Sequence, residues 1–326
     1  MWRRVIESTI RRSNHTKEGL ESISKARLQS TLAFEEIKGI PKTPSKEDPC
    51  VGLIVHGLLG AGRNWRSVST QLAKQAAVES GREWRLFLVD LRNHGQSAKL
   101  EGFRSPHSIQ AAAGDLVHFV QKEIGASPKM VVGHSMGGKV VLEYTRILGQ
   151  PGESVSMPKQ VWVLDSQPGK VPAEFTATSD VDKVLDAVKG IPEPVDSRDW
   201  LYKHMQGQGF SLGLAQWLGS NLHGKADHPL RWMFNVAGAS DMYESYKMTD
   251  CYSILKAPPP GTTINVVRAG KSDRWDDAMI QELEQIAKQT QALPGSTRSL
   301  VLENAGHWLH VDNPRGLIEM MLPSML

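Results

Sequence analysis

Short apolar runs alternate with amphipathic helical segments along most of the chain. The runs end in glycine or polar residues, which is typical of strands buried on both faces of a parallel sheet. Strands are predicted at residues 32–37, 51–56, 86–90, 130–132, 161–164, 263–267 and 299–302. Helices are predicted at residues 65–80, 108–124, 139–148, 276–290 and from about residue 314. Since crossovers between parallel strands are right-handed, this order indicates a mostly parallel, doubly wound α/β sheet.

The pattern changes between residues 169 and 258, where strand-like runs stop. Helical segments are predicted there at 179–190, 197–207, 211–222, 228–238 and 240–255. We interpret 169–258 as a helical cap inserted into an α/β core made of residues 31–168 and 259–326. The candidates for lining a ligand cavity in this cap are Met205, Trp217, Trp232, Met233, Phe234 and Met242. We expect most of them to pack within the cap, as apolar side chains at helical spacing usually do.

The first 30 residues differ from the rest of the chain. They are rich in arginine and serine, Glu7 is the one acid before Glu18, and apolar residues from Trp2 to Ile10 share one helical face. This pattern is typical of a transit peptide and favours a mitochondrial or plastid location. The alternative is a solvated N-terminal arm on a cytoplasmic protein.

Composition excludes several classes of function. Charged residues make up 22% of the chain and the formal net charge is +3, with no basic block in the body, so a nucleic-acid partner is not expected. No apolar run is long enough for a transmembrane segment. Cys50 and Cys251 are isolated and match no metal-ligand spacing, and no glycine-rich nucleotide motif occurs. We therefore expect neither a metal ion nor an organic cofactor.

A serine flanked by glycines follows one of the predicted strands. The stretch Gly133-His134-Ser135-Met136-Gly137 lies between an apolar run and a helical segment. A G-x-S-x-G motif in this position forms a tight turn that exposes the serine at the edge of the sheet. Because a serine hydroxyl needs a base to become a nucleophile, the rest of the chain should supply one. Ser135 is the predicted nucleophile.

The predicted base is His307, which follows the last apolar strand. Its loop should leave the same sheet edge as Ser135, where open α/β sheets place their sites. Two aspartates compete as the acid that orients it. Asp273 follows the strand that ends near Arg268, and Asp165 follows the strand at 161–164. Both satisfy the chain order serine, acid, histidine, and we favour Asp273 with Asp165 as the alternative.

Two backbone N–H groups are expected to form an oxyanion hole. One belongs to Met136, the residue after the nucleophile, and the other to Leu58 in the glycine-rich loop HGLLG. Gly57 and Gly60 allow this loop to turn tightly after its strand.

Four longer strings carry a family resemblance: HGLLGAGRNW, VDLRNHGQS, VVGHSMGGK and AGHWLHVDNP. In this order they resemble the α/β-hydrolase superfamily, in particular the branch of α/β-hydrolase domain-containing protein 11 and related small bacterial esterases. The resemblance covers residues 32–326. It implies an α/β-hydrolase fold with a cap inserted after the sixth strand, Ser135 as nucleophile and His307 as base. Some relatives use an acid that matches Asp165, whereas most α/β hydrolases use one that matches Asp273.

The expected function is a serine hydrolase that cleaves small-molecule carboxylic esters through an acyl-enzyme on Ser135, without a cofactor. One alternative is a non-catalytic ligand-binding protein on the same fold. The other is a thioesterase, acyltransferase or lipase with the same site. A dehalogenase or epoxide hydrolase of this fold would need an aspartate in place of Ser135.

Overall fold

The computed structural model describes residues 31–43, 45–171, 180–224 and 229–326. The transit peptide predicted at residues 1–30 lies outside the described residues.

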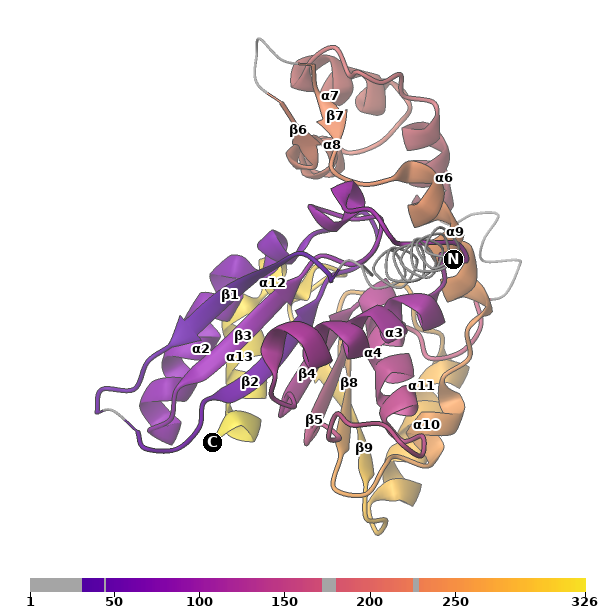
Figure 1. The fold of residues 1–326 in the computed structure, drawn as a ribbon. Helices are drawn as coiled ribbons and strands as arrows, with labels where there is room; N and C mark the ends of the chain where they lie inside the picture. The colour runs from indigo at the N-terminus through magenta and orange to yellow at the C-terminus, as the bar shows by residue number, and fades with distance from the viewer. Residues whose placement is uncertain (1–30, 44, 172–179, 225–228) are drawn as a thin grey trace, which may run out of the picture.

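A seven-stranded sheet forms the centre of the structure (Figure 1). In spatial order its strands are β1 Phe34–Gly39, β3 Trp84–Val89, β2 Cys50–Val55, β4 Met130–His134, β5 Gln160–Leu164, β8 Thr263–Ala269 and β9 Ser296–Leu302. Strand β1 pairs antiparallel with β3, and every other pair is parallel. The carboxyl ends of the parallel strands therefore share one edge.

Helices cover both faces of the sheet, which confirms the doubly wound architecture. Helices α2 Arg66–Ser80 and α13 Pro314–Met321 pack on one face, and α3 Ile109–Phe119, α4 Met136–Leu148 and α11 Asp277–Thr290 pack on the other. Successive strand residues belong to opposite faces: Val131 packs with the α4 side and Val132 with the α2 side. Because both faces are buried, these strands read as continuous apolar runs rather than alternating ones.

Two helices have boundaries that differ from the prediction. The segment predicted at 108–124 is α3 followed by a π-helical turn, Val120–Ile124. Helix α4 begins at Met136 rather than Lys139. Its first turn contains two glycines, whose low helix propensity conceals the true start in the sequence.

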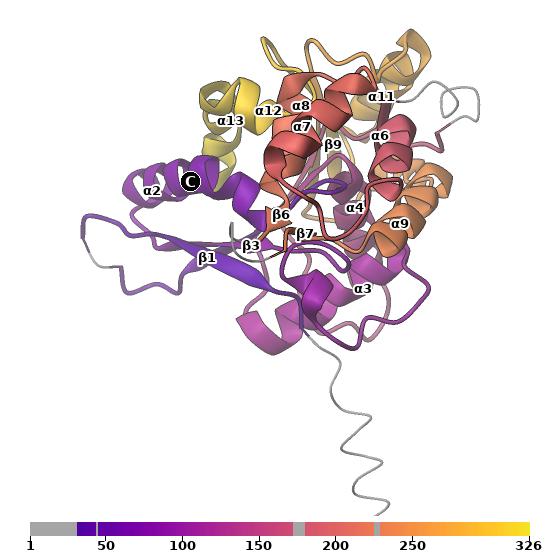
Figure 2. The ribbon, with the colours of Figure 1, turned by 90° about the horizontal axis from the view of Figure 1, so that it is seen from above.

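Much of the insertion between β5 and β8 lies over the carboxyl edge of the sheet, whereas its last helix packs beside β9 (Figures 1 and 2). It contains α6 Asp180–Lys189, α7 Arg198–Gly207, α8 Leu212–Ser220, α9 Val236–Met248 and α10 Tyr252–Lys256. The insertion follows β5, the fifth strand of the described chain, whereas the family resemblance implied a position after the sixth strand. The count is lower because the described chain has one strand, β1, before β2.

The helix predicted at 228–238 is wrong at residues 229–235, and only 236–238 are helical, as the start of α9. Strand β7, Arg231–Trp232, pairs antiparallel with β6, Leu222–His223, and α9 begins only at Val236. The Asn235 side chain caps this helix by accepting from the Gly238 N–H at 3.0 Å. The apolar positions between 230 and 234 fit a helix or a strand, and pairing with β6 decides the outcome.

A buried lysine joins the insertion to the sheet. Lys139 lies on α4 and is 0% exposed, and its ammonium donates to three carbonyls, those of Gly169, Tyr246 and Thr249, at 2.6–2.9 Å. Gly169 precedes α6, whereas Tyr246 and Thr249 lie at the end of α9. One ammonium thus holds both ends of the insertion. Burial lowers the pKa of Lys139 to about 8, so at neutral pH the group is still mostly charged and needs these acceptors.

Cys50 and Cys251 are buried free thiols. Among the helices of the described chain, none combines the length and the apolar composition needed to cross a bilayer.

Candidate active site

Ser135 lies on a strained turn between β4 and α4. Its φ of 52° and ψ of −122° are unusual for a residue with a side chain. Such backbone strain is concentrated at functional sites, where the surrounding structure enforces it. The turn carries the serine out of the sheet at the carboxyl edge, under the insertion.

The flanking glycines are required by close approach of the backbone. A Cβ at Gly133 would lie 2.1 Å from the Gly137 carbonyl oxygen, and a Cβ at Gly137 would lie 2.5 Å from the His56 carbonyl oxygen. No larger residue fits either position without moving a strand or the helix. The two glycines therefore let α4 start directly against β2 and β4, which fixes the position of Ser135.

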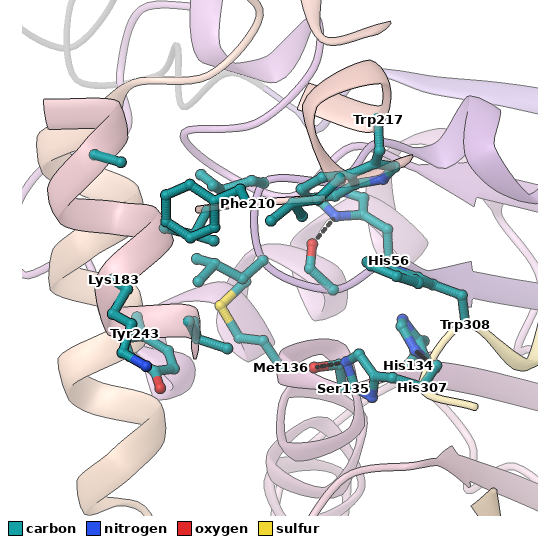
Figure 3. A pocket seen from close by; sticks show the side chains of 18 of the residues that line it. His56, His134, Ser135, Met136, Lys183, Phe210, Trp217, Tyr243, His307 and Trp308 are labelled. Atoms are coloured by element: carbon teal, nitrogen blue, oxygen red, sulfur yellow. Dashed lines mark hydrogen bonds between the residues drawn. The ribbon is translucent and has the colours of Figure 1, made fainter. Parts of the chain in front are cut away.

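A chain of two hydrogen bonds connects Ser135, His307 and Asp165 (Figure 3 shows the first of them). His307 Nε2 is 3.1 Å from Ser135 Oγ, and His307 Nδ1 donates to Asp165 Oδ2 at 2.7 Å. The three residues come from the ends of β4, β5 and β9. In such an arrangement the histidine can take the serine proton while the carboxylate stabilises the resulting imidazolium.

Asp273, the acid favoured from the sequence, acts on His307 through its charge, which favours a higher pKa of the ring, and not through a described hydrogen bond. Its loop leaves β8 at the same edge, but the side chain is exposed and no described hydrogen bond joins it to His307. Asp165 is 1% exposed and takes the position beside the ring. The structure thus brings Asp165, the alternative acid, together with His307, and leaves Asp273 outside this hydrogen-bond chain.

Four hydrogen bonds hold the Asp165 carboxylate. Besides His307, Ser272 Oγ donates to Oδ2 at 2.8 Å, and the Trp275 indole N–H and the Ala269 N–H donate to Oδ1 at 2.8 and 3.1 Å. Burial alone would raise the pKa of Asp165, but these donors outweigh it and lower the pKa to about 2. The carboxylate is thus charged at any physiological pH. Ser272 and Trp275 were not identified from the sequence, although they lie on either side of Asp273, the acid favoured there.

A hydrogen bond from His134 holds the backbone of His307. His134, the residue before Ser135, is buried, and its Nε2–H donates to the His307 carbonyl at 2.7 Å. His310 lies against the same ring cluster and stacks on Trp65 with ring centroids 4.0 Å apart. Burial lowers the pKa of His307 below 6.5 despite its bond to Asp165, and lowers that of His310 to about 4. All three rings are therefore held in their neutral form.

The loop after β2 lies beside Ser135. His56 donates through Nδ1 to the Gly57 carbonyl at 2.7 Å and accepts the Leu91 N–H at Nε2 at 3.0 Å, which ties this loop to the loop after β3. Leu58 and Met136 both line the cavity above the serine. Within the described chain, neither of their N–H groups donates to another protein atom. Both donors predicted for the oxyanion hole thus lie next to Ser135 with free hydrogen-bonding capacity.

A cavity of about 970 Å³ separates the core from the insertion and has Ser135 in its wall. Phe210 and Trp217 face Ser135 and His307 across this cavity (Figure 3). Trp217 is the one predicted cap residue that lines it. The others are buried and do not line the cavity: Met205, Trp232, Met233, Phe234 and Met242. Three of them contact the core rather than the insertion alone, since Met233 meets Arg63, Phe234 pairs with His94 and Met242 meets Asn93. Sequence reasoning missed several lining residues, namely Phe210, Leu214, Tyr243, Tyr246, Arg274 and Trp308.

Within the described ranges, no three His, Cys, Asp or Glu side chains are grouped so as to hold a metal ion. The site consists of a serine, two neutral histidines, a buried carboxylate and two free N–H groups. These are the groups that acyl transfer through a serine requires.

Two relatives of known name share sequence with this chain. A probable alcohol acetyltransferase of Saccharomyces cerevisiae is 38% identical over 92 residues, which cover 28% of this chain and 24% of the yeast protein. The sn-1-specific diacylglycerol lipase ABHD11 of Mus musculus is 27% identical over 272 residues, covering 82% of this chain and 78% of the mouse protein.

The fold is shared with a solved esterase from a marine microorganism. The two structures superpose with a TM-score of 0.68 at 24% identity, over 90% of this chain and 98% of the esterase. The model of the alpha/beta hydrolase family matches residues 53–320, which is most of the chain. The chain therefore belongs to the alpha/beta hydrolase family.

Proposed function

We propose that this protein is a serine hydrolase that cleaves carboxylic esters of small molecules. The observation that carries the proposal is the Ser135–His307–Asp165 chain of hydrogen bonds at the wall of a cavity large enough for a small-molecule ester. The names of the mouse lipase and the marine esterase support ester hydrolysis as the class of reaction.

In the first half of the proposed reaction, Ser135 Oγ attacks the ester carbonyl while His307 Nε2 accepts its proton. The negative charge that develops on the carbonyl oxygen is stabilised by the N–H groups of Leu58 and Met136. His307, now an imidazolium paired with Asp165, then donates its proton to the departing alcohol. An acyl group remains bonded to Ser135 Oγ.

In the second half, a water molecule replaces the alcohol. His307 removes a proton from this water as it attacks the acyl carbonyl, and the same two N–H groups stabilise the second oxyanion. The proton then passes from His307 to Ser135 Oγ, and the carboxylic acid leaves. The protein's own groups perform every proton transfer in this scheme.

Within this proposal Asp165 is the acid of the triad and Asp273 is not. The 2.7 Å bond to His307 Nδ1 and the low pKa of Asp165 support this choice. A permanently charged carboxylate in this position fixes the histidine tautomer and favours proton uptake at Nε2.

The proposal is tested by labelling with a fluorophosphonate probe, which reacts with activated serines. Wild type should label, and Ser135→Ala and His307→Ala should not, while their circular dichroism and thermal midpoints stay near those of wild type. Ser80→Ala is the matched control, because Ser80 ends α2, at the opposite end of that helix from the site, and its hydroxyl bonds only to nearby backbone, donating to the Ala76 carbonyl and accepting the Arg82 N–H. This control should label fully.

Labelling of the folded Ser135→Ala protein at the wild-type rate would contradict the proposal. Absence of labelling in folded wild type would favour the alternative, a non-catalytic protein that binds ligands in the same cavity.

The acceptor of the acyl group separates hydrolysis from the transferase alternative. The relative named a probable alcohol acetyltransferase makes this comparison worthwhile. If hydrolysis is the main reaction, the free acid should dominate the products even when ethanol is added. A predominance of ethyl ester would assign transferase activity instead.

We also propose that residues 1–30 direct the protein to a mitochondrion or plastid, on the basis of their arginine-rich amphipathic pattern. A fluorescent protein fused to this segment should enter the organelle. Diffuse cytoplasmic fluorescence would contradict the proposal.

A further inference from the structure

The loop after β8 covers Asp165 and also places the cationic side chain of Arg274 in the cavity wall. Ser272 and Trp275 both donate to Asp165, and Arg274, which lies between them in sequence, lines the cavity. The Gln167 side-chain amide donates to the Arg274 carbonyl, and the Arg274 N–H approaches Ser272 Oγ at 3.5 Å. The backbone of Arg274 is therefore held on both sides, so its side chain is presented to the cavity by a fixed loop.

The Arg274 guanidinium lacks a partner among the described residues: no hydrogen bond or ion pair engages it there. The other charged side chains of the cavity wall are Lys183 and Asp186, and Asp186 is paired with Lys189 at 3.3 Å. The neighbouring Asp273 is exposed. An arginine with five donors and no acceptor in a cavity wall is well suited to binding a carboxylate or phosphate.

The charge of Arg274 also acts against the reaction when the cavity holds a neutral ester. It contributes to lowering the pKa of His307, which means that it disfavours the imidazolium formed during each acyl transfer. An anion paired with Arg274 would cancel this effect. The two observations are independent. The first is that the Arg274 guanidinium lacks a partner among the described residues, and the second is that its charge disfavours protonation of His307.

We propose that Arg274 binds an anionic group of the substrate, so that the preferred esters carry a carboxylate or phosphate close to the scissile bond. This inference rests on the proposed function, since it specifies the substrate class of the same site. Arg274 is then a residue that determines specificity. It takes no part in proton transfer.

The test uses two matched ester pairs. In the first, 4-acetoxybenzoate and its methyl ester, the charge is on the alcohol; in the second, the 4-nitrophenyl monoester of adipic acid and 4-nitrophenyl hexanoate, it is on the acyl group. The enzymes are wild type, Arg274→Gln, Arg274→Lys and Arg298→Gln. Arg298 is the matched control because its side chain is exposed and its backbone lies opposite Asn265 in the β8–β9 register, toward the amino-terminal edge of the sheet and away from the cavity.

Wild type should have the higher kcat/KM for the anionic member of at least one pair. Arg274→Gln should lower that value roughly ten- to a hundredfold, the usual effect of losing a hydrogen bond between charged groups. The neutral member should react at an unchanged or higher rate, a crossover that a merely damaged site would not produce. Arg274→Lys should retain part of the preference, and Arg298→Gln all of it.

Three results would overturn the inference: a preference of wild type for the neutral member of both pairs, an equal loss on both members in Arg274→Gln, or the same loss in Arg298→Gln. Each leaves the proposed function intact if Ser135 is still labelled. Failure of labelling together with no turnover of any ester would instead remove the proposed function itself.

Discussion

Asp165 illustrates what a single residue position does in this site. Four donors converge on its carboxylate, and two of them come from the loop that carries the competing Asp273. The sequence placed both aspartates at the correct sheet edge, because each follows an apolar strand. It could not rank them, since only the three-dimensional structure shows that the loop after β8 folds over Asp165 and leaves Asp273 exposed. By contrast, the positions of Ser135 and His307 at one sheet edge could be predicted from the sequence, because each follows an apolar strand within a recognisable motif, and the structure brings the two side chains within 3.1 Å of each other.

This difference gives a prediction for the two aspartates. Asp165→Asn should reduce kcat by about 10⁴-fold, because an amide cannot hold the histidine in the required tautomer or stabilise its charge. Asp273→Asn is the matched control and should change kcat little. Both values come from initial rates with a neutral ester. A larger loss in Asp273→Asn than in Asp165→Asn would contradict the assignment.

At the scale of elements, the alternation of strands and helices could be read from the sequence because burial on both sheet faces produces continuous apolar runs. The segment around β7 could not, because its few apolar residues fit two periods and pairing with β6 decides between them. The role of Lys139 was also hidden. A lysine in a first helical turn suggests a solvated side chain, whereas here three carbonyls of the insertion surround it.

Replacing Lys139 by methionine should destabilise the protein by about 2–4 kcal/mol, because buried carbonyls lose a charged donor. Lys256→Met is the control: its ion pair with Glu282 at 2.9 Å joins side chains that are 53% and 41% exposed, so the loss should stay below about 1 kcal/mol. Urea unfolding measures both. Hydrogen exchange should also accelerate in α9 for Lys139→Met alone. Equal effects of the two substitutions would contradict this role of Lys139.

At the scale of the whole molecule, buried neutral histidines link stability to pH. Burial lowers the pKa of His56 and His310 to about 4 and that of His94 to about 3, and His134 is lowered as well. In the unfolded chain these groups bind protons near pH 6.5. Between pH 6.5 and 4 the unfolded state therefore binds more protons than the folded state, so stability falls as the pH falls.

The expected loss is large. Protonating a histidine whose pKa is lowered from 6.5 to about 4 costs up to about 3 kcal/mol of stability at acid pH. The losses at His56, His94 and His310 together approach the total stability of a typical domain. We expect cooperative unfolding between pH 6 and 4. Asp165 acts later, because its pKa of about 2 means that its stabilising charge is lost only below about pH 4.

The measurement is the thermal midpoint as a function of pH, for wild type and for His94→Gln. The substitution removes one titrating ring whose Nδ1 bonds to the Arg92 carbonyl at 2.9 Å, and it should make the slope between pH 6.5 and 4 shallower. Identical slopes for the two proteins would show that His94 does not contribute.

The three hydrogen bonds of the Lys139 ammonium also bear on how a substrate can reach Ser135. Both ends of the insertion are hydrogen-bonded to one side chain of the helix that follows Ser135, so we expect these ends to stay against the core when the cavity opens. We expect the insertion to move at the side away from Lys139, where Trp217 of α8 faces Trp308 of the core with ring centroids 6.0 Å apart. We expect the side chains of Trp217 and Trp308 to separate when a ligand enters or leaves the cavity. The part of the insertion bonded to Lys139 would then keep its position.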